Sequence, residues 1–226
     1  TKEIAKAKSE KLGMIGYEAL MDYFDPGRGM EEIDGLFNDL KSFLPNLIEE
    51  VISHQSKNEN QEIELEGIFP IQKQKDLAID LMKKSGFDFD HGRLDVSAHP
   101  FCGGVPGDVR ITTRYREDEC LTSLMGVMHE TGHALYENNL PKDWRLQPVG
   151  SALGMSIHES QSLFFEMQCA KTRQFLNYLK PFVIDSFNLD PKLNNKLDLF
   201  NILNKVKRSL IRVDADEVTY PLHIIV

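Results

Sequence analysis

Apolar residues recur every three or four positions along much of the chain, which is the period of an α-helix with one buried face. One such run lies between residues 30 and 54 and includes Ile33, Leu36 and Phe37. Pro45 lies inside this run and should kink or restart the helix. Similar patterns predict helices over residues 1–24, 71–85, 119–139, 155–182 and 190–205, and from residue 214 onward. The chain is therefore expected to be mainly α.

The helical period is lost between residues 91 and 118. Residues 94–98 and 109–115 contain β-branched side chains, and a segment rich in glycine and proline separates them. We interpret these segments as two short strands joined by a glycine-rich turn. The result would be a small β-hairpin or short sheet beside the helix predicted over residues 119–139. The charged residues 57–66 predict a loop or link.

The predicted helix over residues 119–139 carries the sequence His-Glu-Thr-Gly-His at positions 129–133. Residues four apart on a helix share one face, about 5–6 Å apart at Cβ, so His129 and His133 can reach one metal ion. Glu130 projects about 100° further round the helix, where it suits the role of a general base acting on water. The flanking residues are mostly apolar, and a buried histidine needs a partner. The motif favours a metallopeptidase site over an unliganded histidine pair.

A catalytic zinc ion takes three protein ligands, so one more must come from elsewhere in the chain. Glu137 is the nearest candidate, but eight residues separate it from His129, which corresponds to about 12 Å along a helix. Glu159 lies on the mostly apolar helix predicted over residues 155–182, and we expect it to be the third ligand. His158 is the competing donor. The alternative is that Glu159 lies on a solvated first turn, where the helix dipole favours an acidic residue.

Five blocks of sequence follow one another in a distinctive order. They are His99-Pro100-Phe101, residues 108–112 (DVRIT), 129–133 (HETGH), 158–161 (HESQ) and 211–217 (IRVDADE). Together they resemble the metallocarboxypeptidases of the carboxypeptidase Taq family. The resemblance implies a mainly α, zincin-like peptidase fold, a Zn²⁺ ion for which Co²⁺ can substitute, and hydrolysis of the C-terminal peptide bond of peptides. It also implies a homodimer.

An enzyme that removes C-terminal residues needs a cation to bind the terminal carboxylate, and arginine offers a bidentate fork for it. Arg212 is the first candidate and Arg110 the second, although either could instead pair with a neighbouring aspartate. His99 is expected to contact the substrate or the tetrahedral intermediate, or else to pack within its own block. Asp216 and Glu217 are possible outer partners of a metal-bound histidine.

The family pattern extends beyond both ends of the sequence. A further block resembling Gly-x-x-Gln-Asp-x-His-Trp is expected after Val226, and a helical stretch before Thr1. We therefore expect residues 1–226 to form one domain, the central portion of a longer metallocarboxypeptidase. It would comprise a helical part (1–90), a part with short strands (91–118) and a helical metal-binding part (119–226). The alternatives are a non-catalytic or split fragment of such an enzyme and a zinc-dependent oligoendopeptidase.

Composition limits the partners of the protein. A net charge of −9 disfavours nucleic acid, because phosphate binding needs a basic face. No run approaches the roughly 18–20 apolar residues that span a bilayer, so no membrane partner is expected. The three cysteines (Cys102, Cys120 and Cys169) are not closely spaced, which suits reduced thiols in the cytoplasm. We expect Cys102 to be a passive thiol and the substrates to be peptides with a free C-terminal carboxylate.

Overall fold

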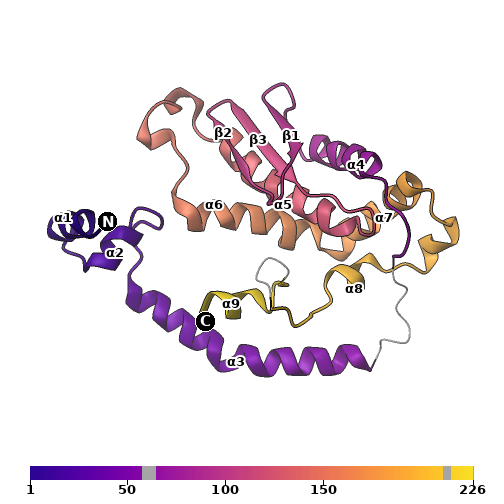
Figure 1. Cartoon of the computed structure of the whole chain (residues 1–226), viewed down its shortest axis with the longest axis horizontal. Coiled ribbons are helices and arrows are strands. Elements are labelled where there is room, and N and C mark those ends of the chain that lie inside the picture. Colours follow the sequence, from indigo (N-terminus) through magenta and orange to yellow (C-terminus); the bar gives the residue numbers. More distant parts are fainter. Residues whose placement is uncertain (58–64, 211–214, 226) are drawn as a thin grey trace. The chain divides into compact units, whose positions relative to one another are not determined.

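The computed structural model describes residues 1–57, 65–210 and 215–225, and the chain divides into two compact units (Figure 1). The first unit comprises Thr1–Asn60, Leu153–Ile157 and Lys205–Val226. The second comprises Gln61–Ala152 and His158–Asn204. Helices predominate in the described residues, and a small three-stranded sheet lies in the second unit. The prediction of a mainly α fold with a short sheet is confirmed.

The first unit begins with two short helices rather than the single helix predicted over residues 1–24. These are α1 (Lys2–Leu12) and α2 (Gly16–Met21). The helix ends early because Gly13 adopts a left-handed conformation with φ of 72°, and its N–H donates to the carbonyl of Ser9. Glycine adopts this conformation without strain, so it commonly terminates a helix. The prediction of one continuous helix is wrong.

The long helix α3 (Met30–Ser56) agrees closely with the prediction over residues 30–54. Pro45 lies within α3 and does not restart it, although Figure 1 shows that the helix changes direction partway along. Proline removes one backbone hydrogen bond and crowds the preceding turn, which bends a helix that is held by other contacts. Leu44 and Ile48 are buried, and α3 contacts the C-terminal helix α9 (Tyr220–Ile225).

The sheet of the second unit has strand order β1-β3-β2, with β3 in the centre (Figure 1). Its strands are β1 (Gly92–Val96), β2 (Cys102–Val105) and β3 (Asp108–Thr113). β1 runs parallel to β3, so a tight turn cannot join these two strands. Between them the chain returns in the opposite direction as β2, which pairs antiparallel with β3. The two predicted strands are confirmed, but the glycine-rich segment between them contains a third strand.

The core of the second unit forms where the sheet meets α5 (Leu121–Asn138). Val109 and Ile111 of β3 are buried, and α5 contacts both β3 and β2. α4 (Ile71–Lys84) packs against α5, and its bounds confirm the helix predicted over residues 71–85. As expected from its composition, α5 is buried on several faces. Its buried apolar side chains are Leu121, Leu124, Met125, Val127, Met128 and Ala134.

The helix predicted over residues 155–182 is interrupted. It consists of α6 (Gly154–Leu163), a π-helical segment, η4 (Phe164–Ala170), and α7 (Arg173–Phe187). The break before α7 has a local cause, because the Thr172 side chain accepts a hydrogen bond from the backbone N–H of Phe175 and caps the new helix. The prediction of one continuous helix is wrong here as well.

The last predicted helices are shorter than expected. Residues 190–205 form η5 (Pro191–Asn195) and α8 (Leu199–Leu203). Each follows an aspartate whose side chain accepts from the backbone, Asp190 from one N–H group and Asp198 from two. The helix expected from residue 214 begins only at Tyr220. Two short 3₁₀ helices, η2 (Lys142–Trp144) and η3 (Pro148–Gly150), follow α5. Most of the loop predicted over residues 57–66 lies outside the described residues.

Candidate metal centre

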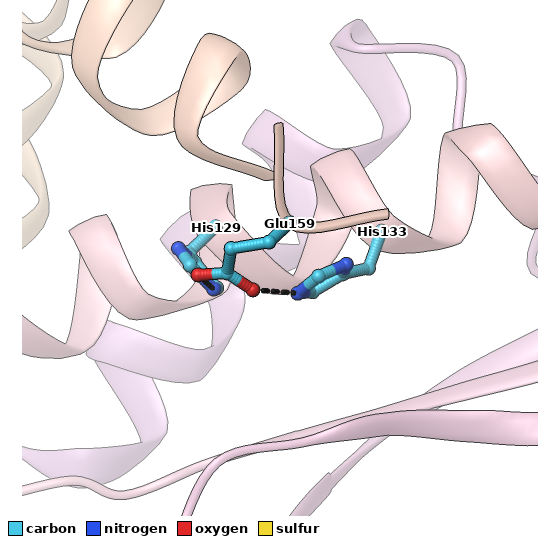
Figure 2. Close-up of side chains that lie close together, drawn as sticks. All are labelled: His129, His133 and Glu159. Carbon is cyan, nitrogen blue, oxygen red and sulfur yellow. Dashed lines mark ion pairs between the residues drawn. The ribbon is translucent and has the colours of Figure 1, made fainter. Parts of the chain in front are cut away.

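Three side chains from two helices converge beside the sheet. His129 and His133 lie one turn apart on α5, and Glu159 reaches them from α6 (Figure 2). Nε2 of His129 lies 3.6 Å from Oε1 of Glu159, and Nε2 of His133 lies 3.3 Å from Oε2. One donor atom from each residue lies within 4.8 Å of the other two. The structure thus brings together the three side chains that the sequence proposes as ligands.

These separations suit a divalent metal ion. Zinc bonds to histidine nitrogen and carboxylate oxygen are about 2.0–2.2 Å long, so neighbouring donors at tetrahedral angles lie about 3.4 Å apart. The two nitrogen–oxygen distances, 3.3 and 3.6 Å, lie on either side of that value. Two neutral imidazoles and one carboxylate are also a donor set that zinc commonly takes. The residues present therefore fit the ion that the motif predicts.

Gly132 explains how Glu159 comes so close to α5. A Cβ atom at this position would lie 2.7 Å from the carbonyl oxygen of Gln161 and 2.8 Å from the Cα of Ser162. Contacts this short with backbone atoms are not relieved by moving a side chain. The two helices therefore touch at Gly132, and this contact places Glu159 over the histidine pair.

Glu130 is buried next to the three candidate ligands. The residue is 6% exposed, and its Oε2 atom has no hydrogen-bond partner among the described residues. Burial raises the pKa of this carboxyl, and the neighbouring His129 and His133 oppose the shift only in part. A buried acceptor without a partner is costly, and such atoms often mark a functional site. Glu130 thus offers an unused acceptor beside the cluster.

Each histidine of the pair also contacts a further side chain through its Nδ1 atom. Nδ1 of His129 lies 2.9 Å from Oε2 of Glu166, whose Oε1 lies 3.3 Å from Nζ of Lys171. On the other side, Nδ1 of His133 lies 2.6 Å from Nδ1 of His158. Because Nδ1 is engaged in both rings, Nε2 is the nitrogen that each turns toward Glu159.

Several of these outer partners have roles that the sequence does not predict. Glu137 and His158 are expected from the sequence only as possible metal ligands, whereas Nε2 of His158 lies 2.7 Å from Oε1 of Glu137. Glu166 is not among the predicted site residues. The available signal was a single acidic residue within the mostly apolar segment of residues 164–170. A charge in such a segment needs a buried partner.

The ionisable groups of the cluster shift one another's pKa values. Hydrogen bonding to His133 lowers the pKa of Glu159, although the partial burial of this carboxyl opposes the shift. Burial alone would lower the pKa of His129, but the bond to Glu166 and the nearby carboxylates outweigh it and raise the pKa overall. A cation is therefore favoured between these residues, and a bound metal would replace the proton.

The other predicted site residues lie in varied surroundings. Arg110 is exposed on β3 and pairs with Asp108 at 2.6 Å, which corresponds to the ion-pair alternative. His99 is exposed in the segment between β1 and β2. Arg212 lies outside the described residues. The Asp216 carboxylate accepts three backbone N–H groups within the first unit, from Lys207, Val218 and Thr219.

The thiol next to the cluster is unreactive in character. Burial, with added repulsion from Glu130 and Glu137, raises the pKa of Cys102 to about 12. A thiol with such a raised pKa is a poor nucleophile at neutral pH. This agrees with the passive role expected for Cys102.

A His-Glu-x-x-His helix, a carboxylate from a second helix and a small neighbouring sheet are features typical of a mainly helical metallopeptidase. Comparison with known proteins makes the class specific. The chain belongs to the carboxypeptidase Taq (M32) metallopeptidase family, whose model matches residues 1–226.

Individual relatives agree with this assignment. Thermostable carboxypeptidase 1 of Thermus thermophilus is 40% identical over 211 residues, which cover 93% of this chain and 41% of that protein. Carboxypeptidase 1 of Bacillus subtilis is 38% identical over 218 residues, covering 93% and 42%. The solved structure of Trypanosoma cruzi metallocarboxypeptidase 1 superposes with a TM-score of 0.93 at 44% identity, covering 99% of this chain and 46% of that one. The chain thus spans less than half the length of each relative.

Proposed function

We propose that the full-length protein is a metal-dependent carboxypeptidase that hydrolyses the C-terminal peptide bond of peptides. Membership of the M32 family and the names of its relatives support this activity. The observation that carries the proposal is the convergence of His129, His133 and Glu159 within 4.8 Å, with the buried carboxyl of Glu130 beside them.

Each residue of the cluster would have a distinct role. A divalent ion held by His129, His133 and Glu159 would supply Lewis-acid activation of water and of the scissile carbonyl. Glu130 would accept the proton of the attacking water and return it to the leaving amine. Its buried position beside the three candidate ligands and its unpaired Oε2 atom suit this role, because a general base must lie within hydrogen-bond reach of the proton that it accepts.

The substrate would lie along the sheet. In the described part of the chain β2 pairs only with β3, so its outer edge is free to bind an extended peptide backbone. β2 also contacts α5, the helix of the histidine pair. His99 precedes β2 and would contact the substrate near this edge. The free terminal carboxylate would bind Arg212 in preference to Arg110, because Arg110 already pairs with Asp108.

Three finer properties complete the proposal. Two nitrogen donors and one oxygen donor favour Zn²⁺, for which Co²⁺ can substitute. The three cysteines are free, which supports a reducing cytoplasmic setting. None of the helices among the described residues is both long and apolar enough to cross a bilayer. We also propose that the full-length protein forms a homodimer and binds neither nucleic acid nor membrane.

The experiment compares N-blocked peptides that differ only at the C-terminus. The full-length, zinc-loaded protein should release the last residue from the free acid and leave the C-terminal amide intact. A metal chelator should abolish the release. Arg212→Gln should raise KM for free-acid peptides, because a fixed bidentate contact is lost. Cleavage of acid and amide at equal rates would identify an endopeptidase and contradict the proposal.

A further inference from the structure

The two histidines of the pair differ in what holds them. The ring of His133 is held by another imidazole, that of His158, whereas the ring of His129 is held by a carboxylate, that of Glu166. Glu166 uses its two oxygens separately, with Oε2 at 2.9 Å from His129 and Oε1 at 3.3 Å from Lys171. The side chains of Glu166 and Lys171 are only 15% and 14% exposed, so solvent screens their interaction weakly.

The π-helical geometry of η4 makes the Glu166–Lys171 pair possible. The backbone N–H of Lys171 donates to the carbonyl of Glu166 at 3.0 Å, the i to i+5 bond that defines a π-turn. In a regular α-helix, residues five apart point about 140° away from each other. The wider turn of a π-helix brings the two side chains to the same side of the helix. Glu166 and Lys171 are therefore joined twice, by a backbone hydrogen bond and by the ion pair between their side chains.

We propose that Glu166, fixed by Lys171 across this π-turn, is a positioning residue that holds the ring of His129 with Nε2 toward the metal. This inference rests on the proposed metal site and adds two residues that act on the ligand His129 rather than on the metal ion itself. Lys171 neutralises Glu166 and prevents its carboxylate from turning away from Nδ1 or toward the ion itself. Outer partners of this kind typically change metal affinity by about 10–100-fold.

The experiment measures Zn²⁺ affinity of the full-length protein by competition with a chromophoric chelator. Glu166→Gln retains an oxygen that can accept from Nδ1 but removes the charge, and should weaken Zn²⁺ binding by about 10–100-fold. Lys171→Met should cause a smaller loss. If Lys171 acts only through Glu166, the double variant should match Glu166→Gln alone. Asp80→Asn, which breaks the exposed pair with Lys84 on α4, is the control and should bind Zn²⁺ like the parent protein.

The spectrum of the Co²⁺-loaded protein gives a second readout, since a displaced imidazole changes the visible absorption bands. Glu166→Gln should shift these bands and the control should not. Unchanged Zn²⁺ affinity and an unchanged Co²⁺ spectrum in Glu166→Gln would overturn the inference, as would fully additive losses in the double variant. If Glu166→Gln does not fold, Lys171→Met decides by the same two measurements. A parent protein that binds no Zn²⁺ would overturn the proposed function as well.

Discussion

Glu130 combines two properties that are rarely found together in a side chain with a purely structural role. It is almost fully buried, and one of its oxygens has no hydrogen-bond partner in the described part of the chain. Burial also raises its pKa, because desolvation disfavours the charged carboxylate. An unsatisfied carboxylate of this kind destabilises the fold, so its presence beside His129 and His133 is best explained by chemistry.

The substitution Glu130→Gln tests this role. Glutamine has nearly the same shape but cannot accept a proton, so kcat/KM of the full-length protein should fall by about 100-fold or more. The zinc content should be unchanged, because Glu130 is not among the three converging donors. Steady-state kinetics and elemental analysis of the same preparation give both quantities. Turnover close to that of the parent protein would remove Glu130 from the mechanism.

At the scale of single residues, the sequence was informative where chemistry depends on local spacing. The four-residue separation of His129 and His133 is enough to predict that they share a helix face. Glu159 could be proposed as the third ligand because it is a carboxylate on a second, mostly apolar predicted helix. Glu166 and Lys171 could not be predicted in this way, because their contact depends on a π-turn that leaves no clear mark in the sequence.

At the scale of elements, the site depends on how closely α5 and α6 approach each other. The hypothetical Cβ of Gly132 would meet three atoms of the opposite segment at 2.7–2.9 Å, two of them in the backbone. Any larger residue would have to push the helices apart by several tenths of an ångström. Glu159 lies on the helix that would move, so its distance from His129 and His133 depends on Gly132.

We therefore expect Gly132→Ala to be destabilising although alanine is the better helix former. The gain in helix propensity is about 1 kcal/mol, whereas overpacking typically costs about 1–3 kcal/mol and here involves rigid backbone. Zinc affinity should fall together with the free energy of unfolding. Gly126→Ala in the same helix is the control, because its Cβ would meet only Thr113 Oγ1, at 3.8 Å, and it should be neutral or stabilising. Denaturant unfolding and zinc titration measure both; normal values for Gly132→Ala would contradict the role of this contact.

Regular elements were predictable and their interruptions were not. The helices over residues 30–54 and 71–85 have an unbroken apolar period, and α3 and α4 follow it closely. The breaks at Gly13 and before α7 depend on local backbone geometry that competes with a continuing helical pattern. The strand β2 was misread as a turn because it is rich in glycine, and its extended form depends on pairing with β3.

At the scale of the whole molecule, the four residues of the proposed centre belong to one compact unit. His129, Glu130, His133 and Glu159 all lie in the second unit. The chain covers 41–46% of the relatives to which it is similar, so turnover and substrate recognition are properties to be tested on the full-length protein. All four residues of the proposed centre are among the described residues, so the structure bears most directly on metal binding.

The most direct test is an anomalous difference map at the zinc edge from crystals of the zinc-loaded, full-length protein. We expect one peak about 2.0–2.2 Å from Nε2 of His129, Nε2 of His133 and a carboxylate oxygen of Glu159. A map without a peak between the two imidazoles, or with Glu159 turned away from the ion, would contradict the proposed metal centre.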